Sequence, residues 1–270
     1  MDNLDWYSNP YVLRNMVTPL YNREFSYTAL RARDNKPFHK KSMTASNYKF
    51  LHSVLTNPSE HIIDVYTSLS VYDLSPIMGC THTAKTKFFA KTIPNYWIHA
   101  YDLDSKDDIL KSAVQTGQLV SKLTGINPEW FISIKYSGEK GFHIETQQRG
   151  VFTQAVQENK CTADELKYAL NLDTIDLAIY TPRREWRCPY SIHHSGKVAM
   201  PLTLKEFTMI LSHLPSSVNF FYPDKAIKHF AVKDQGYKWF SLRGNDSPRP
   251  NSRTKEDLEK LVIALDHATG

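Results

Sequence analysis

The sequence predicts an α+β fold with mixed or antiparallel sheets, and two observations support this prediction. First, apolar, β-rich segments occur at 62–71, 97–103, 130–135 and 142–146, with helix-start signals between and after them. Second, the order is strand, helix, hairpin, helix and then further strands, unlike the regular alternation of a doubly wound parallel sheet. A chain of 270 residues can bury a large core, and we expect a single domain over residues 1–270.

Local signals place the elements of the first half. Residues 5–20 read as an aromatic-rich helical cap, and the strand at 97–103 ends at two carboxylates. Ser105 and Asp108 form a capping-box pattern that predicts a helix to about Thr124, with Gly125 as its C-terminal cap. The glycine-containing segment 137–141 then predicts a turn between the strands at 130–135 and 142–146.

The second half is read in the same way. Thr162 with Glu165 predicts a short helix to Leu170, and the segments 175–179 and 190–193 alternate as strands, with 197–200 pairing back. Two further capping patterns predict helices from Thr203 and Thr254, whose apolar faces are Phe207, Ile210, Leu211 and Leu214, and then Leu258, Leu261, Val262 and Leu265. The polar segment 235–253 reads as a loop, so residues 206–270 are expected to be a helical and loop extension packed on the core.

Composition excludes several classes of protein. The contents of 41% hydrophobic and 23% charged residues are ordinary for a globular protein, and a net charge of +5 is compatible with nucleic acid without being diagnostic. No run of 18 apolar residues exists and residues 1–5 lack a signal-peptide pattern, so we expect no membrane association. Three widely spaced cysteines favour a reducing compartment, and we expect a cytoplasmic protein, nucleoid-associated if prokaryotic.

Three segments carry the chemistry. Asp102 and Asp104 are two residues apart, so on a strand they leave one face with Cα atoms roughly 7 Å apart and repel each other unless cations neutralise them. From spacing alone, two solvated acids at a strand end are an equal alternative. The segments 137–143 and 187–193 supply a cation, hydroxyls, imidazoles and glycine-exposed backbone N–H groups, which suit phosphates. Together the segments favour phosphoryl or nucleotidyl transfer.

The order and spacing of these segments resemble the archaeo-eukaryotic primase superfamily, close to the catalytic small subunit of DNA primases. That family carries Asp-x-Asp, then Ser-Gly-x-x-Gly-x-His, then a later Asp before a Pro-x-Ser-x-His stretch, and here these match 102–104, 137–143, Asp176 and 189–193. Residues 22–27 resemble the family's Arg-Glu-Phe segment, so the resemblance spans about 20–205. This chain departs from the family in having Glu139 where Arg is frequent, and no cysteines for a zinc knuckle between 105 and 125.

The resemblance implies an RNA-recognition-motif-like sheet beside a second α/β unit, with the active site in the cleft between them. Asp102, Asp104 and Asp176 would hold two Mg²⁺ or Mn²⁺ ions, with Asp173 as the competitor for the third position. The neighbouring glycines assign Ser137, Lys140 and His143 to the incoming triphosphate, although a structural role is the commoner one for a lone histidine. By resemblance, that site is completed by Arg187, Ser191, His193 and Lys197, with Glu24 near the sugar; the alternative for Glu24 is a surface pair with Arg23.

The predicted function is DNA-template-dependent synthesis of primers from nucleoside triphosphates and their extension, as in a primase-polymerase. Primer extension without initiation and a catalytically decayed nucleic-acid-binding module are the alternatives. The expected partners are single-stranded DNA and NTP or dNTP, with a partner subunit or fused domains left open. Two weaker motifs are Cys80 with His82, half of a zinc site or free surface groups, and the lysines at 85, 87 and 91 among aromatic residues, suited to a template or simply solvated.

Overall fold

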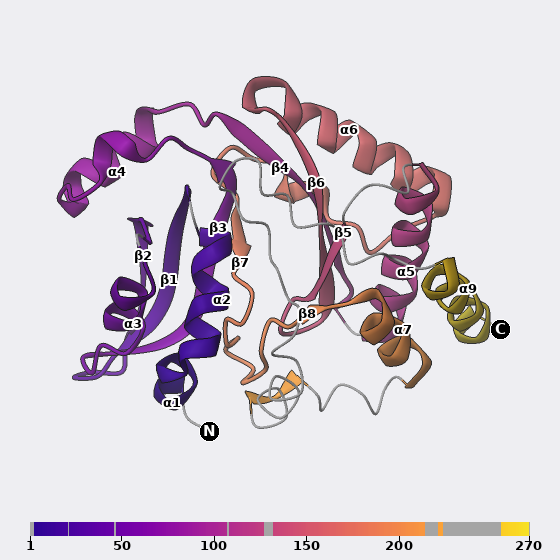
Figure 1. The fold of residues 1–270 in the computed structure, drawn as a ribbon, viewed down its shortest axis with the longest axis horizontal. Coiled ribbons are helices and arrows are strands. Elements are labelled where there is room, and N and C mark those ends of the chain that lie inside the picture. The colour runs from indigo at the N-terminus through magenta and orange to yellow at the C-terminus, as the bar shows by residue number, and fades with distance from the viewer. Residues whose placement is uncertain are drawn as a thin grey trace.

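The chain folds around one antiparallel sheet, described here from a computed structural model. The structure describes residues 3–20, 22–45, 47–106, 108–126, 132–213, 221–223 and 255–269. Every strand pairing in it is antiparallel, and helices cover the sheet in separate groups (Figure 1). The predicted α+β class is therefore confirmed.

The strands form a single eight-stranded sheet. They are β1 (Arg23–Arg31), β2 (Pro37–Met43), β3 (Glu60–Val71), β4 (Tyr96–Asp104), β5 (Ile132–Tyr136), β6 (Gly141–Val151), β7 (Glu185–Arg187) and β8 (Pro201–Leu202). Their order is β2-β1-β3-β4-β6-β5-β8, and β7 pairs with β3 beside this path. The predicted strands at 62–71 and 97–103 are thus confirmed as parts of β3 and β4.

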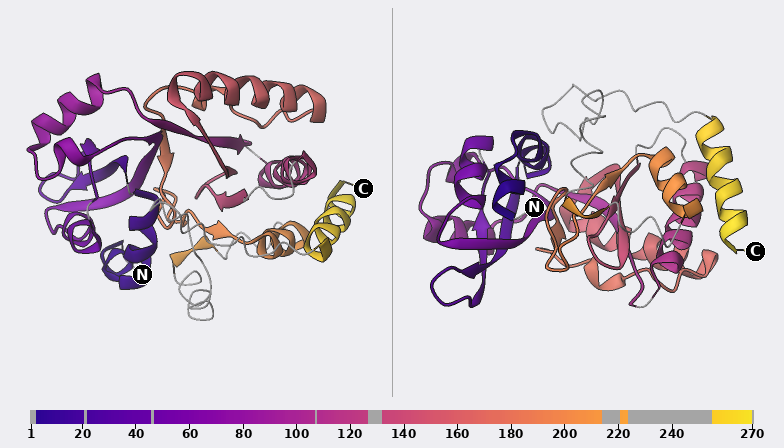
Figure 2. Two further views of the ribbon diagram at one scale, coloured as in Figure 1. Left: turned by 45° about the horizontal axis from the view of Figure 1, so that its top comes forward. Right: turned by 90° about the horizontal axis from the view of Figure 1, so that it is seen from below.

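The helices divide between the two ends of the sheet. They are α1 (Asn3–Ser8), α2 (Pro10–Leu20), α3 (Tyr48–Leu55), α4 (His82–Lys91), α5 (Ile109–Ile126), α6 (Phe152–Leu170), α7 (Leu204–His213) and α9 (Lys255–Thr269), with short 3-10 helices η1 (Ser75–Ile77) and η2 (Leu177–Ile179). Helices α1 to α3 pack near β1 and β3, whereas α5 and α6 pack on β4 and β6 (Figures 1 and 2). Helices α7 and α9 extend the second group by packing against α5.

One discontinuity in the sheet positions the site. Strand β3 pairs with β4 only at Ser70 with Trp97 and Val71 with Tyr96. Continuing that register would place Tyr66 opposite Tyr101, but Tyr66 pairs with Arg187 of β7 instead. Strand β7 therefore separates β3 from the far end of β4, where the two carboxylates lie. Strands β3 and β4 therefore diverge at that point, and β3 keeps its backbone pairing there through β7.

Two predicted strands are wrong. Ile175 makes only a single bridge to Leu103, and Leu177–Ile179 is a 3-10 helix because the Asp176 side chain accepts the Ala178 N–H at 2.8 Å. The segment 190–193 forms one bridge, from Ile192 to Val198, rather than a strand. Tyr190 has a φ of 64°, which no regular strand accommodates. The segment 197–200 does pair back as predicted: besides that bridge, the N–H groups of Tyr190 and His193 donate to the carbonyls of Ala199 and Lys197, each at 2.7 Å, and the Ala199 N–H donates to the Ser191 carbonyl at 2.8 Å.

Several helix boundaries also differ from those predicted. Helix α6 begins at Phe152, ten residues before Thr162, as part of a 19-residue helix. Helix α5 begins at Ile109, where Asp108 accepts the Lys111 N–H at 3.0 Å, and it runs past Gly125, so the Ser105 capping box and the glycine cap are wrong. The segment 85–91, with its three lysines, lies in helix α4. Strands β1 and β2 and helix α3 have no counterpart among the predicted elements.

The C-terminal predictions hold only in part. Helix α9 buries Leu261 and Leu265, but Val262 is exposed. The predicted loop at 235–253, the cap at Thr254 and Leu214 lie outside the described residues. None of the helices in the described ranges is long and apolar enough to cross a membrane.

The capping box of α7 makes a testable contribution to stability. The Thr203 N–H donates to Glu206 Oε2 at 2.8 Å, and the Glu206 N–H donates to Thr203 Oγ1 at 3.1 Å. Thr203→Ala should lower the free energy of unfolding by about 1 kcal/mol, because one N-terminal N–H loses its acceptor. Urea denaturation measures this, with Thr203→Ser as the control that keeps the hydroxyl and should remain near wild type. Equal losses in both variants would contradict the capping role.

Candidate active site

Strand pairing places three of the predicted site residues on one face. Asp102 lies directly opposite His143 across β4 and β6, and Asp104 lies opposite Gly141. Opposed residues of an antiparallel pair point to the same side, so Asp102, Asp104 and His143 share a face. His143 Nε2 is 3.6 Å from Asp102 Oδ1. The alternate residues Tyr101 and Leu103 are buried beneath the opposite face.

Backbone contacts bring Asp176 to the same place. The Asp176 N–H donates to the Asp102 carbonyl at 2.8 Å, and the Asp104 N–H donates to the Thr174 carbonyl at 2.9 Å. Asp173, the competing residue, faces away and contacts Lys111 Nζ and Gln115 Nε2. The structure therefore brings together Asp102, Asp104 and Asp176, and it separates Asp173 from them.

The carboxylates oppose one another electrostatically. Burial raises the pKa of Asp102 well above its usual range, and the charges of Asp104 and Asp176 raise it further. Burial also raises the pKa of Asp104, with Asp176 adding to the effect while Lys140 acts against it. Nearby positive charge from Arg184 lowers the pKa of both carboxyl groups but does not reverse the shift. The site thus holds more negative charge than its own cations offset.

Gly141 is required by the close approach of Asp104. A Cβ atom at position 141 would lie 2.0 Å from Asp104 Oδ1 and 2.1 Å from the Leu103 carbonyl oxygen. Any other residue would displace the carboxylate or the strand. Gly138 has a φ of +101°, in the left-handed region, and a Cβ there would lie 2.8 Å from His193 Cβ. The two glycines bring the 137–141 turn against the carboxylates and against His193.

The carboxylates fit a divalent cation. Oδ1 of Asp102 and Oδ1 of Asp104 are both buried and have no hydrogen-bond partner among the described residues. Unsatisfied buried carboxylate oxygens are costly unless a donor or a cation compensates them. Mg²⁺ and Mn²⁺ take such oxygen ligands. These carboxylate oxygens are therefore suited to binding a hard divalent ion, which would compensate their buried charge.

Buried polar and aromatic residues pack against the His143 ring and fix its position. The His143 ring stacks on Trp186 with centroids 3.9 Å apart, and Trp186 Nε1 donates to Glu145 at 2.6 Å. Lys135 Nζ lies 5.3 Å from the Trp186 ring centroid and 3.9 Å from Glu145. Burial, with the nearby charges of Lys135 and Arg184, holds the pKa of His143 well below its usual range. The imidazole is therefore neutral at neutral pH, with its orientation fixed by the stack.

Arg187 and His193 enter the site from the segment after β7. The Arg187 guanidinium pairs with the buried Asp64 and lies 5.1 Å from the Tyr66 ring centroid. Burial lowers the pKa of Arg187 to about 10, so the group stays charged at neutral pH. Burial and then the charge of Arg187 lower the pKa of His193 to about 3, so His193 is neutral. A charged guanidinium and a neutral imidazole thus flank the carboxylates.

These side chains line one cleft of about 170 Å³. The predicted residues in its walls are Asp102, Asp104, Ser137, His143, Arg187 and His193. Residues not assigned from the sequence line it as well: Tyr66, Glu139, Arg184, Glu185 and Trp186. The cleft lies where β7 separates β3 from β4, so four strands and three connecting segments contribute to it.

Five predicted site residues do not line this cleft, and one of them is Asp176, whose position beside Asp102 is described above. Ser191 is fully buried, and its Oγ accepts the Val65 N–H at 2.7 Å, so it serves the β3 backbone. Lys140 and Lys197 stand beside the cleft and act through their charge, on Asp104 and His193 respectively. Glu24 belongs to a different cavity.

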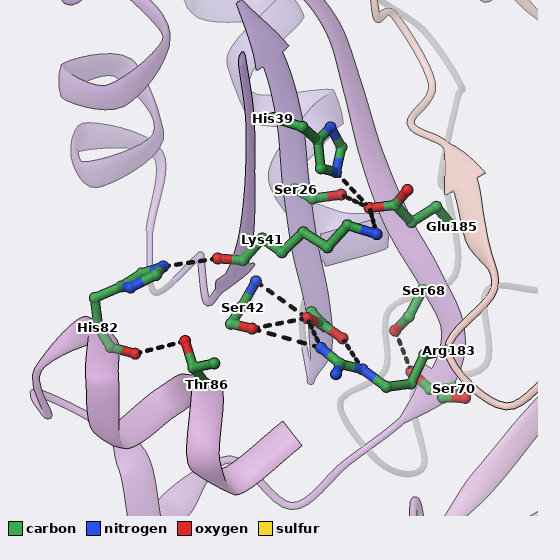
Figure 3. A network of polar contacts seen from close by, with 11 residues as sticks. Ser26, His39, Lys41, Ser42, Ser68, Ser70, His82, Thr86, Arg183 and Glu185 are labelled. Carbon is green, nitrogen blue, oxygen red and sulfur yellow. Dashed lines mark hydrogen bonds and ion pairs between the residues drawn. The ribbon is translucent and has the colours of Figure 1, made fainter. Parts of the chain in front are cut away.

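Glu24 contacts Ser42 and Arg183, two residues of the neighbouring polar network labelled in Figure 3. Its carboxylate accepts from Arg183 Nη2 at 2.5 Å and from the Ser42 N–H at 3.0 Å. Together with Glu185 it lines a cavity of about 130 Å³ beside the main cleft. The alternative, a surface pair of Glu24 with Arg23, is wrong, because Arg23 is buried and its Nε donates to the Ser68 carbonyl. Glu185 lines both cavities and is the link between them.

Some functional neighbours could not be read from the sequence. Arg184 lines the cleft, and its Nη2 is 3.9 Å from Asp176 Oδ2. The ring centroids of His193 and His194 are 3.7 Å apart, because this segment is a turn and not a strand, in which adjacent side chains would point to opposite faces. Cys80 and His82 join no group of three or more potential metal ligands in the described ranges. The only sequence signal for Arg184 is its place in a charged run before Trp186.

Comparison with known proteins gives the class of fold. No protein-family model matches the chain, and no curated protein matches it by sequence. Among solved structures, the chain is similar to the polymerase domain of ligase D from Mycobacterium tuberculosis, determined in complex with DNA. The TM-score is 0.59 at 12% identity, over 86% of this chain and 88% of that chain. The chain therefore has the fold of a DNA polymerase domain, and the likeness extends over most of both chains.

The burial of Asp102 makes stability depend on pH. The pKa of Asp102 in the folded state is raised above the ordinary value of 3.8. At pH values between the unfolded and folded pKa, the folded state therefore binds more protons than the unfolded state, and stability falls as pH rises through this range. Asp102→Asn cannot ionise and should raise the free energy of unfolding near pH 7 by about 1 kcal/mol or more, since a tenfold change in proton binding corresponds to about 1.4 kcal/mol. The gain should shrink toward about pH 4. Urea denaturation in a chelating buffer measures it.

Asp173→Asn is the matched control. Hydrogen bonds from Lys111 and Gln115 lower the pKa of Asp173, so its ionised form favours folding above pH 3.8 and that benefit is lost as pH falls. This variant should give no gain near neutral pH. A stabilised Asp173→Asn, or an Asp102→Asn variant that is destabilised at about pH 7, would contradict the electrostatic account.

Proposed function

We propose that the protein is a DNA-template-dependent nucleotidyltransferase, a primase-polymerase that synthesises primers from nucleoside triphosphates and extends them. The observation that carries the proposal is the convergence of Asp102, Asp104 and Asp176 beside a cleft with two buried carboxylate oxygens that lack partners. The fold it shares with a DNA polymerase domain supports the same class of reaction. The proposed core is of the archaeo-eukaryotic primase type, with residues 1–270 as one catalytic domain.

Asp102, Asp104 and Asp176 would hold two Mg²⁺ or Mn²⁺ ions. Such ions, when bound, lower the pKa of a 3′-hydroxyl and offset the charge of a departing pyrophosphate. The chain's own contribution is to hold three carboxylates in one place before substrate arrives, which the β4–β6 register and the Asp176 N–H accomplish. No side-chain nucleophile is required.

The remaining cleft residues would bind the triphosphate. Arg187 offers a charged guanidinium, Ser137 a hydroxyl, and His143 and His193 imidazoles. Lys140 and Lys197 add positive charge from the cleft edge, and Gly138 lets the turn approach closely. Ser191 would act indirectly, by fixing β3, and Glu24 in the adjoining cavity would act through Glu185 and Arg183. Charge-assisted contacts of this kind are the strong ones for phosphate.

A narrower reaction is the second candidate. The structural neighbour is the polymerase domain of a ligase, bound to DNA, and its likeness is compatible with extension of an existing primer. Initiation differs because two nucleotides must be collected at once, which costs more entropy than adding one to a primer. Single-stranded DNA is the expected template in both cases, and a partner subunit or fused domains would be compatible with either reaction.

The test is synthesis on unprimed and primed single-stranded DNA, with labelled nucleotides and Mg²⁺ or Mn²⁺, followed by product length on a gel. Wild type should form products on both templates. Asp102→Asn and Asp104→Asn should each lose several kcal/mol of transition-state stabilisation, about 1,000-fold or more in rate. Asp173→Asn should retain activity. Primer extension without dinucleotides favours the narrower reaction, whereas carboxylate variants within about tenfold of wild type would overturn the catalytic assignment.

His143 separates substrate binding from the chemical step. His143→Gln should weaken nucleotide binding by about 10- to 150-fold, because a charge-assisted phosphate contact contributes roughly 1.5–3 kcal/mol. His99→Gln is the matched control, since burial also lowers the pKa of His99 but that side chain does not line the cleft. Titration with labelled nucleotide measures both. Equal affinities for the two variants would make His143 a structural residue.

A further inference from the structure

A second group of potential metal ligands stands beside the carboxylates. Asp64, His193 and His194 each offer one ligand atom, and these atoms lie within 4.8 Å of one another. They come from distant parts of the chain, β3 and the turn after β7. None of the three is among the carboxylates Asp102, Asp104 and Asp176. From this geometry we infer that Asp64, His193 and His194 form a separate binding site for a divalent transition-metal ion.

The surrounding contacts orient the first two ligands. Arg187 pairs with Oδ1 of Asp64, which leaves Oδ2 facing His194, whose Nδ1 is 3.9 Å away. His193 Nδ1 is 2.9 Å from Ser195 Oγ, and that hydroxyl in turn donates to the Gly138 carbonyl at 2.9 Å. In the tautomer that carries the ring proton on Nδ1 and donates it to Ser195 Oγ, Nε2 can bind a metal. Binding in this way replaces the hydrogen bond that the Ser195 N–H donates to Nδ1 at 3.0 Å and the 3.5 Å contact of Nε2 with Glu139 Oε2. Outer partners of this kind are what fix ligating carboxylates and imidazoles elsewhere.

The third ligand can adapt. Asp64 and His193 are buried, whereas the His194 side chain is 60% exposed. Zinc bonds of about 2.0–2.1 Å in a tetrahedron bring ligand atoms to about 3.3 Å apart, so roughly 1 Å of closure is needed. Rotation of the exposed His194 side chain supplies such a movement without disturbing β3. The turn that brings the two histidine rings together is held by the His193 N–H, which donates to the Lys197 carbonyl at 2.7 Å.

The donor set selects the class of ion. Two imidazoles and one carboxylate suit Zn²⁺, Co²⁺ or Mn²⁺, whereas Mg²⁺ prefers oxygen ligands alone. The nearby Arg187 charge weakens any purely electrostatic binding, which disfavours Mg²⁺ further. Three protein ligands leave a fourth position open. His193 lines the main cleft, so that position is close enough to the cleft for a water or an anionic group to occupy it.

The experiment uses the tag-free full chain carrying Asp102→Asn and Asp104→Asn, so that the carboxylate site cannot take the probe. Co²⁺ is titrated and its visible absorption recorded, since tetrahedral nitrogen and oxygen ligation gives intense bands. One Co²⁺ should bind with that spectrum. Adding His194→Ala should weaken binding by more than about 100-fold, since even outer partners contribute about 10- to 100-fold. Adding His52→Ala, which removes another exposed histidine, should change nothing.

Folding is checked separately by thermal melting in a chelating buffer, where the His194→Ala and His52→Ala variants should match their parent. Zn²⁺ should then raise the melting temperature of the parent and of the His52→Ala variant, but not that of the His194→Ala variant. Absence of Co²⁺ binding in the parent would overturn the site. Equal Co²⁺ affinity with and without His194 would overturn it as well. Because nucleotide synthesis is not the readout, failure here is distinct from failure of the proposed function.

Discussion

The burial of Asp102 beside Asp104 is the constraint on which the rest of this site depends. Two carboxylates leaving one face of a strand repel each other, and burial adds a desolvation cost to that repulsion. The fold meets this cost with rigid surroundings. Asp102 is held by its pairing across to His143, and Asp104 fits only because position 141 is glycine. The buried carboxylates lower the free energy of unfolding, and in return the fold holds a preorganised negative site. Such sites are common where a protein binds a cation.

The support beneath the site is itself polar and buried. Arg23, Lys135 and Glu145 lie around Trp186, and the short segment β7 carries that tryptophan into the sheet. A buried charge network of this kind is worth little for net stability, but removing one member strands the others. It holds the face on which His143 stacks. The orientation of His143 toward Asp102 thus depends, through Trp186, on Arg23, Lys135 and Glu145, which do not line the cleft.

Strand β7 and the residues before it connect the two cavities. Arg183 turns to Glu24 in one cavity, and its neighbour Arg184 turns to the carboxylates in the other. Glu185 lines both and pairs with His39 and Lys41 of β2. The two arginines lie at the end of a turn before β7, in which the Arg184 N–H donates to the Thr181 carbonyl at 3.0 Å, and this short segment serves two sites. A change at β7 would therefore be felt in the carboxylate cleft and in the β1–β2 network together.

The sequence by itself determined the α+β class, the strand that ends at Asp102 and Asp104, and the capping box at Thr203. These follow from alternation and from contacts within three residues, which are local and independent of the rest of the chain. The preference for Asp176 over Asp173 also agrees with where the two side chains lie, although it drew on family resemblance and not on spacing.

Only the tertiary structure decided which side chains meet. Asp64 finds Arg187 across 123 residues, and His194 joins His193 because a turn replaces the predicted strand. Ser191, which the resemblance assigned to phosphate binding, instead accepts a hydrogen bond from the backbone of β3. Glu24 lies in the adjoining cavity. Such pairings depend on strand register and on where β7 enters the sheet. A shift by one residue would turn each side chain to the other face, and local patterns carry no record of that choice.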